Sequence, residues 1–140
     1  MTAEFNDNQG CFICGKNNPF GLKVGFELDR EKGTAETVVS FPEHLQCWDK
    51  VVHGGLLAAI LDETMIYAAG AAGFRCVTGE LTVRYLKPVP TCAPVRVKGR
   101  FTGRKGRVVT AEAELFDEKG EVLARASGKL VRIAQEAQAR

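Results

Sequence analysis

The chain has 140 residues, which is enough for one domain with a substantial hydrophobic core, and we expect a single domain over residues 1–140. Hydrophobic residues make up 45% and charged residues 26%, as in globular proteins, and the net charge of +2 is too small to indicate a nucleic-acid partner. No apolar run follows a basic N-terminus, and the number of cysteines, five, is odd. We therefore expect reduced thiols and a cytoplasmic protein rather than a secreted disulfide framework.

The first part of the chain predicts a loop followed by a β-hairpin. Residues 1–21 have no periodic pattern, and the stretch CFICGKNNPFGL carries the glycines and the proline that favour a loop. Residues 22–30 alternate apolar and polar side chains, and residues 34–41 are rich in β-branched residues. Both segments predict strands, joined by a turn at residues 31–33. Residues 43–52 predict an irregular connection.

The stretch HGGLLAAILDETMIYAAGAAG, residues 53–73, predicts one long buried helix. Between Leu56 and Ala72 the only charged residues are Asp62 and Glu63. A helix that is apolar on all sides lies in the core of a protein rather than at its surface. Its two adjacent acids would be costly in lipid, so the stretch does not predict a membrane span, and we expect no membrane partner.

Beyond the helix the apolar residues recur with a period of two, which is typical of strands. The predicted strands cover residues 77–89, 94–102, 108–116 and 122–133. Tight turns are expected at residues 103–106 and 117–120, and the polar tail 134–140 is expected to be loose. The order β-β-α-β-β-β-β predicts an α+β fold in which a six-stranded antiparallel sheet wraps around one long central helix.

The arrangement resembles a known family. His53, Gly54 and Gly55 are followed by an acid nine positions after the histidine, Asp62. Together with the element order, this pattern resembles the PaaI-type acyl-CoA thioesterases of the hotdog fold. The segments CFICG…NPFGL, TGELTVRYLKPVP and GRKGR also match, and the resemblance covers about residues 11 to 132. It implies an enzyme that hydrolyses an acyl-CoA to a free acid and coenzyme A, with coenzyme A as part of the substrate and no separate cofactor.

The resemblance also implies a role for individual residues. Asp62 would be the catalytic carboxylate, Thr78 would hold the attacking water, and the Gly54 N–H would polarise the thioester carbonyl. Basic residues near the hairpin would bind the phosphates of coenzyme A, and those in this sequence are Arg104, Lys105 and Arg107. Several relatives have an asparagine six positions before the histidine as a second carbonyl contact. Cys47 stands there in this chain, so a second oxyanion contact is not identified.

The surroundings of Asp62 point to the same chemistry. Its neighbours three and four positions away on a helix are Ala58, Ala59, Met65 and Ile66. A carboxylate in such surroundings is costly unless it is used or partnered. It could act as a general base on water or as a direct nucleophile, or it could instead bridge to an arginine. For the adjacent Glu63 we expect an ion pair with an arginine such as Arg84.

The beginning of the helix is the expected oxyanion site. A helix N-terminus offers unpaired N–H groups, and Gly54 and Gly55 would let a ligand approach the backbone, although glycines here could also serve only tight packing. His53 is expected to bond to the backbone rather than act as a base. Arg84 and Lys87 follow on the next strand and could reach the nucleotide at the mouth of the site.

The spacing along the helix has a consequence for assembly. Gly54 and Asp62 are eight residues apart, which is roughly 12 Å along a helix, so one helix cannot present both groups to one carbonyl carbon. A homodimer with a twofold axis, or a dimer of dimers, would bring Asp62 of one subunit beside Gly54 of the other.

Other interpretations remain open at this point. Cys11-x2-Cys14 and His44-x2-Cys47 have the spacing of a Cys3His zinc site, although loop cysteines without a metal are the simpler expectation, and we predict no metal. A non-catalytic acyl-CoA sensor would not need the acid. A dehydratase or hydratase of the same fold would pair the acid with a histidine on the helix, where the sequence has none.

For the acyl group we expect a lining of apolar residues near the helix, with Trp48, Met65 and Tyr67 as candidates.

Overall fold

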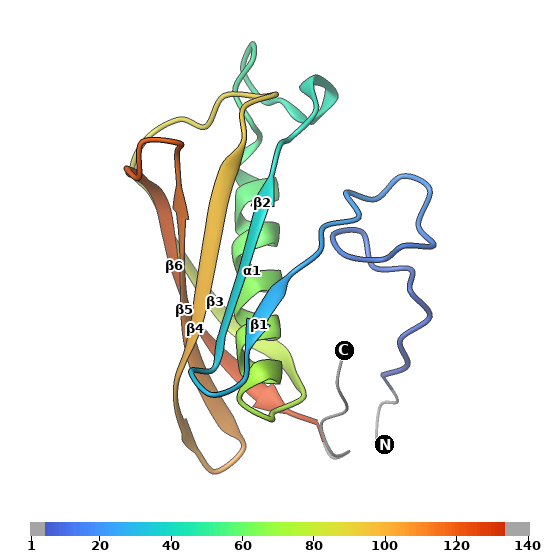
Figure 1. Cartoon of the computed structure of the whole chain (residues 1–140), viewed down its shortest axis with the longest axis vertical. Coiled ribbons are helices and arrows are strands. Elements are labelled where there is room, and N and C mark those ends of the chain that lie inside the picture. Colours follow the sequence, from blue (N-terminus) through green and yellow to red (C-terminus); the bar gives the residue numbers. More distant parts are fainter. Residues whose placement is uncertain (1–4, 134–140) are drawn as a thin grey trace.

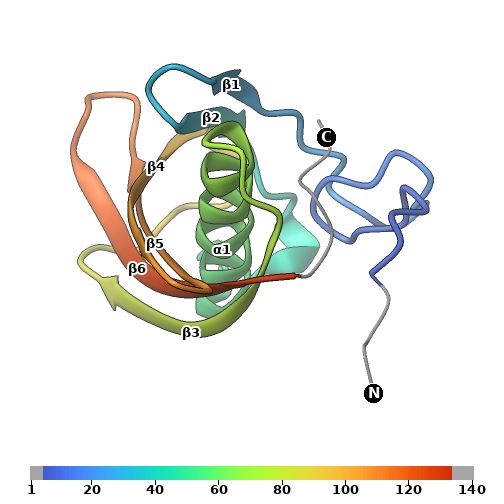
Figure 2. The same ribbon diagram turned by 90° about the horizontal axis from the view of Figure 1, so that it is seen from below.

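A computed structural model describes residues 5–133 of the chain. The elements in chain order are β1 (Glu27–Asp29), β2 (Thr34–Val39), the 3₁₀ turn η1 (Glu43–Leu45), α1 (Gly54–Ala71), β3 (Cys76–Tyr85), β4 (Val95–Lys105), β5 (Val108–Phe116) and β6 (Val122–Arg132). The six strands form one antiparallel sheet in the order β1-β2-β4-β5-β6-β3. The sheet curls around α1, which confirms the predicted hotdog architecture (Figures 1 and 2).

The strand order separates two elements that are neighbours in sequence. β3 pairs with β6 at one edge of the sheet, whereas β4 pairs with β2 and β5 in its interior. Only β1–β2, β4–β5 and β5–β6 are therefore hairpins. The third residue of β3, Thr78, lies beside the middle of the helix, where it contacts Asp62.

Three predicted boundaries are wrong by three or more residues, each for a local reason. The strand expected at 77–89 ends at Tyr85, because the backbone N–H groups of Leu86 and Lys87 both donate to the Leu123 carbonyl and no longer continue the ladder. The strand expected at 22–30 is shortened to β1, because the backbone N–H groups of Leu22 and Val24 donate to the carbonyls of Phe12 and Ile13 in the N-terminal loop instead of to a strand. The tight turn expected at 103–106 lies further on, because β4 continues through a bulge after Phe101 and pairs up to Lys105. Only the second glycine of that segment, Gly106, takes a left-handed conformation, with φ +62°.

The face of α1 toward the sheet carries the core. Its buried residues are Leu57, Ile60, Leu61, Thr64, Met65, Ala68, Ala69 and Ala71. The helix lies very close to β4 at Gly99. A Cβ atom on Gly99 would lie only 2.9 Å from the Thr64 carbonyl oxygen. A side chain at this position would therefore push helix and strand apart.

The opposite side of α1 is covered by the N-terminal loop, which Figure 2 shows across the helix from the sheet. Ile13 and Val24 are buried beneath it, and the Phe26 ring stacks on Tyr67 of the helix with 4.2 Å between ring centroids. The predicted loose tail, residues 134–140, lies outside the described residues, as do residues 1–4. Within residues 5–133 we find no helix that is both long and apolar enough to cross a membrane.

Candidate active site

Asp62 and Thr78, which were expected to act together, are brought into contact by the fold. Asp62 is half-buried in the middle of α1, and Thr78 is the third residue of β3. The Thr78 hydroxyl donates to Oδ1 of Asp62 at 2.5 Å. The ladder between β3 and β6 shifts register between Thr78 and Glu80. The hydrogen bond fixes one carboxylate oxygen, so the other can act on a substrate or a water.

The environment of Asp62 makes the carboxylate more basic than in water. Burial raises the pKa of Asp62 above its ordinary value, the negative charge of Glu63 raises it further, and the hydrogen bond from Thr78 lowers it. The alternative of a bridge to an arginine is not found, since no ion pair of Asp62 occurs among residues 5–133. A partly desolvated carboxylate with one oxygen held in place is suited to accept a proton.

The N-terminus of α1 offers one backbone donor. His53 caps the helix, and its Nδ1 accepts from the Gly55 N–H at 2.9 Å, so His53 bonds to the backbone as expected. This bond occupies Gly55 and leaves Gly54 as the candidate donor, since its N–H meets no acceptor within the described part of the chain. The Tyr85 hydroxyl donates to the Gly54 carbonyl oxygen at 2.8 Å and so ties β3 to the beginning of α1.

A shallow cavity of about 310 Å³ lies at this end of the helix and brings Gly54 and Lys87 to one place. Its walls come from the residues before the helix and from the end of β3 and the segment after it, including Tyr85 and Leu86. Lys87 forms an ion pair with Glu121, and this hydrogen bond and charge raise the lysine pKa. The exposed ammonium therefore stays charged beside the cavity.

The other predicted basic residues do not join this cavity within one chain. Arg104, Lys105 and Arg107 belong to the β4–β5 hairpin, at the opposite end of α1 from Gly54 (Figure 1). The Arg104 guanidinium lies over the Phe74 ring at 5.7 Å from its centroid. Arg84 lies on the outer face of the sheet, in a groove that it shares with Arg100 and Arg125.

Glu63 has a different partner from the one predicted. The thiol of Cys11 donates to Oε2 of Glu63 at 2.8 Å, and no ion pair with Arg84 is formed. The cysteines were expected to meet His44 and Cys47 if they bound a metal. In residues 5–133 the one group of potential metal ligands that comes together is Cys11, Cys14 and Glu63, and the thiol of Cys47 points to the Val51 carbonyl instead.

Burial raises the pKa of the Cys14 thiol to about 12, against a smaller opposing effect of its hydrogen bond with Tyr67. In the absence of a cation Cys14 is thus a thiol at neutral pH. Sequence reasoning missed this group because its members come from two segments 52 positions apart.

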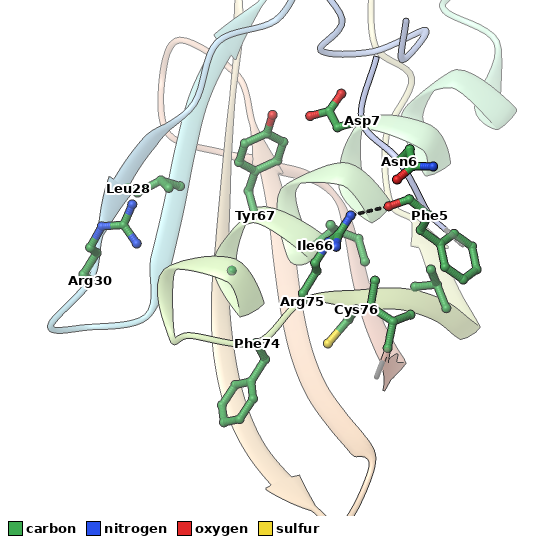
Figure 3. Close-up of a pocket in the computed structure, with 13 residues that line it drawn as sticks. Phe5, Asn6, Asp7, Leu28, Arg30, Ile66, Tyr67, Phe74, Arg75 and Cys76 are labelled. Atoms are coloured by element: carbon green, nitrogen blue, oxygen red, sulfur yellow. Dashed lines mark hydrogen bonds between the residues drawn. The ribbon is translucent and has the colours of Figure 1, made fainter. Parts of the chain in front are cut away.

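A second cavity, of about 200 Å³, opens on the outer side of α1 (Figure 3). Ile66, one turn after Asp62, and Val77, just before Thr78, belong to its wall, whereas the side chains of Asp62 and Thr78 themselves do not line it. Phe5 closes another side, and its carbonyl oxygen accepts a hydrogen bond from the Arg75 guanidinium. Sequence reasoning missed this cavity because its walls come from five separate segments of the chain.

The three residues expected to line an acyl pocket have different positions. Tyr67 lines the cavity of Figure 3. Trp48 is 80% exposed in the single chain. Met65 is buried between α1 and the sheet, where its terminal methyl lies 3.2 Å from the position of a Cβ on Gly128. Of the three, only Tyr67 borders this cavity.

Comparisons with known proteins agree with this fold. A family model described as the thioesterase superfamily matches residues 49–124. A Saccharolobus solfataricus protein provisionally named an esterase is 28% identical over 103 residues, which cover 72% of this chain and 73% of the relative.

Two solved structures have the same fold. The PaaI protein of the phenylacetic acid degradation operon of E. coli superposes with a TM-score of 0.75 at 19% identity, covering 82% of this chain and 83% of that one. A Streptococcus mutans protein bound to acetyl CoA superposes with a TM-score of 0.75 at 15% identity, covering 82% of this chain and 91% of that one.

Proposed function

The chain belongs to the thioesterase superfamily, and from this premise we propose that it hydrolyses an acyl-CoA to the free acid and coenzyme A. The observation that carries the proposal is the hydrogen bond from Thr78 to Asp62 in a half-buried site. A protein that only bound acyl-CoA would not need a half-buried carboxylate of raised pKa.

Asp62 acts as the general base in this proposal. The Thr78 hydroxyl uses its one hydrogen to donate a hydrogen bond to the Asp62 carboxylate, so the lone pairs of its oxygen remain to accept a hydrogen bond from water. Asp62 takes a proton from that water while the water oxygen adds to the thioester carbonyl. The tetrahedral intermediate then expels the thiolate of coenzyme A, which takes up the proton from Asp62, and the acid is released. One water is consumed and no redox step or separate cofactor is involved.

The negative charge that develops on the carbonyl oxygen would be stabilised by the Gly54 N–H. This N–H lies at the positive end of α1 and has no acceptor among residues 5–133. Because α1 is continuous from Gly54 to Ala71, Gly54 and Asp62 stay roughly 12 Å apart along the axis, and one chain cannot apply both to one carbonyl.

A homodimer resolves this separation. In an antiparallel pair of α1 helices, Asp62 of one subunit lies beside Gly54 of the other, and the twofold axis creates two equal sites. The edge strand β3 supports this assembly, because it is hydrogen-bonded on one side only within the described sheet and so offers a free edge to a second copy. A dimer of dimers is compatible with the same site.

The remaining parts of the substrate have places in the same scheme. The solved Streptococcus mutans relative binds acetyl CoA, and the cationic Lys87 at the Gly54 cavity suits a phosphate of the nucleotide. Further candidates for binding the phosphates are Arg84 on the outer face of the sheet and the hairpin residues Arg104, Lys105 and Arg107. The hairpin would reach the nucleotide only from the partner subunit. The acyl group would enter the cavity on the outer side of α1, against Ile66 and Tyr67.

The test is a panel of short aliphatic, long-chain and aromatic acyl-CoAs, with release of free thiol as the readout. The wild type should hydrolyse at least one of them, and Asp62→Asn should reduce kcat by a factor of roughly 100 or more. Glu118→Gln, which makes the same acid-to-amide change on an exposed turn, is the control and should keep full activity.

Full activity of Asp62→Asn would remove the carboxylate from the mechanism. Binding of acyl-CoA by the wild type without thiol release would identify a sensor, and hydration of an enoyl-CoA without thioester cleavage would identify a hydratase.

A further inference from the structure

Cys11, Cys14 and Glu63 form a compact group on the side of α1 that faces away from the sheet. One ligand atom of each residue lies within 4.8 Å of the other two, and all three side chains are half-buried. The cysteines belong to the N-terminal loop, which covers this side of the helix in Figure 2. Two soft sulfur donors and one carboxylate are thus held together by two segments that are distant in sequence.

The loop is shaped so that both thiols point to one place. The Gly15 N–H donates to the Cys11 carbonyl oxygen at 2.8 Å, which closes a tight turn through the two cysteines. A Cβ atom on Gly15 would lie 2.4 Å from the Cys11 nitrogen and 2.5 Å from the Gln9 carbonyl oxygen, so no other residue fits here. The Cys-x-x-Cys-Gly spacing is therefore a requirement of this turn.

The backbone of the same turn also contacts one of the two sulfurs. The Ile13 N–H points to Sγ of Cys11 at 3.4 Å. A backbone donor in this position fixes the direction of the sulfur, as do the secondary contacts that support metal ligands. The described part of the chain provides no arginine or lysine ion pair to Glu63. The group therefore lacks an evident cationic partner from the protein.

We propose that Cys11, Cys14 and Glu63 bind a zinc ion that fastens the N-terminal loop to α1. Two thiolates and a carboxylate are ligands that zinc accepts, and a water completes the tetrahedron. Sulfur and oxygen ligands bound to one zinc ion lie about 3.6–3.8 Å apart, which the present spacing of the three atoms permits. On binding, the two thiols lose their protons to solvent, and the ion replaces the Cys11 to Glu63 hydrogen bond.

The site would act on the fold rather than on the reaction. The loop that it fastens leads from Phe5 and Asp7, which form one wall of the cavity on the outer side of α1. A zinc ion at Glu63 would hold this wall against the helix. The proposal is independent of thioester hydrolysis, because it requires only that the loop and the helix share the ion.

The experiment measures zinc on the full-length chain, without an affinity tag that binds metals. The protein is incubated with Zn²⁺, dialysed against metal-free buffer and assayed by plasma mass spectrometry, and X-ray absorption identifies the ligands. We expect about one zinc ion per chain, with two sulfur ligands. Cys14→Ser and Glu63→Gln should each weaken zinc binding at least tenfold in competition with a chromophoric chelator.

The matched controls are Cys47→Ser and His44→Ala, which remove residues of the other possible ligand set. Both should bind zinc like the wild type, and circular dichroism should show that every variant is folded. The proposal fails if the folded wild type retains no zinc. This holds both when the two thiols are reduced and when a mass loss of two hydrogens shows a Cys11–Cys14 disulfide. It also fails if Cys47→Ser loses the metal while Glu63→Gln keeps it.

Discussion

The Thr78 hydroxyl donates to the carboxylate of Asp62 across the junction between β3 and α1. The two residues are 16 positions apart and belong to elements that the sheet order brings side by side. Burial raises the pKa of Asp62, and the hydrogen bond from Thr78 lowers it. The same hydrogen bond fixes one orientation of the carboxylate. Thr78 thus positions the proposed base and, in the proposed mechanism, also holds the attacking water.

Removing this hydroxyl should slow the chemical step. Thr78→Val keeps the size and the β-branched shape of the side chain but leaves Asp62 without its donor. We expect kcat to fall roughly 10- to 100-fold with little change in KM, because the interaction serves the attacking water rather than the bound ground state. Thr78→Ser restores the hydroxyl and should recover most of kcat. An equal loss in Thr78→Ser, or a change in KM alone, would contradict the role.

The Gly54 N–H can be deleted with little disturbance of the helix. Gly54 is the first residue of α1, where proline is tolerated, and His53 before it has ψ 130°, which suits a residue preceding proline. Gly54→Pro should lower kcat roughly 100-fold or more, the usual cost of losing an oxyanion donor.

Gly54→Ala is the control for that change. It keeps the N–H, and its Cβ would make an ordinary contact of 3.4 Å with the Tyr85 ring. Its kcat should stay close to that of the wild type, with circular dichroism confirming that both variants fold. Similar losses in the alanine and proline variants would place the effect in packing against Tyr85 rather than in the N–H.

The sequence predicted what depends on local pattern. The long apolar stretch around Asp62 predicts a buried helix, and the alternation of apolar and polar residues after Gly73 predicts strands with one buried face. The helix and the strands could therefore be predicted. The Asp62–Thr78 pair was predictable only through the resemblance to a family. The sheet order, in which β3 leaves β4 and joins β6, depends on packing between distant segments and has no local signal.

The contact of Cys11 with Glu63 shows the same limit at a single side chain. An ion pair with an arginine was expected for Glu63, because a carboxylate among apolar residues is costly without a partner. The position of the N-terminal loop against the helix could not be predicted from the sequence. Once the loop is placed, a thiol donor supplies the contact instead. The turn predicted at 103–106 begins only at Gly106 for a smaller reason: Gly103 suggested a turn, but the strand passes this point with a bulge between Phe101 and Gly103.

Close packing of α1 against β4 can be tested at Gly99. A methyl group there would lie 2.9 Å from the backbone oxygen of Thr64, and backbone cannot move aside as a flexible side chain can. Gly99→Ala should therefore reduce the free energy of unfolding by about 1–3 kcal/mol in urea titrations followed by circular dichroism. Gly25→Ala, with nothing within 4 Å of the new methyl, should change it by less than about 0.5 kcal/mol. Equal stability of both variants would show that helix and strand are not in tight contact.

The thiol of Cys76 should be far less reactive than the exposed cysteines. Burial raises the pKa of the Cys76 thiol to about 11, and the positive charge of Arg132 offsets only part of this rise. At pH 8 roughly one Cys76 side chain in a thousand is then a thiolate, the form that iodoacetamide attacks. Peptide mass spectrometry of the native protein should find Cys47 and Cys92 alkylated well before Cys76, and all three alkylated in urea. Labelling of native Cys76 at the rate of Cys92 would contradict its burial.

If each active site is formed by two subunits, two inactive variants should restore activity when they are mixed. A site formed within one chain would show no such recovery. Asp62→Asn chains keep Gly54, and Gly54→Pro chains keep Asp62, so each homodimer lacks one half of both sites. When the two inactive variants are mixed and their subunits exchange, half of the dimers are mixed at equilibrium, and each mixed dimer contains one complete site. Activity should therefore rise to about a quarter of the wild-type value per chain. Native mass spectrometry of a mass-labelled variant measures the fraction of mixed dimers, and mixed dimers without recovered activity would show that Gly54 and Asp62 do not act on one substrate across the interface.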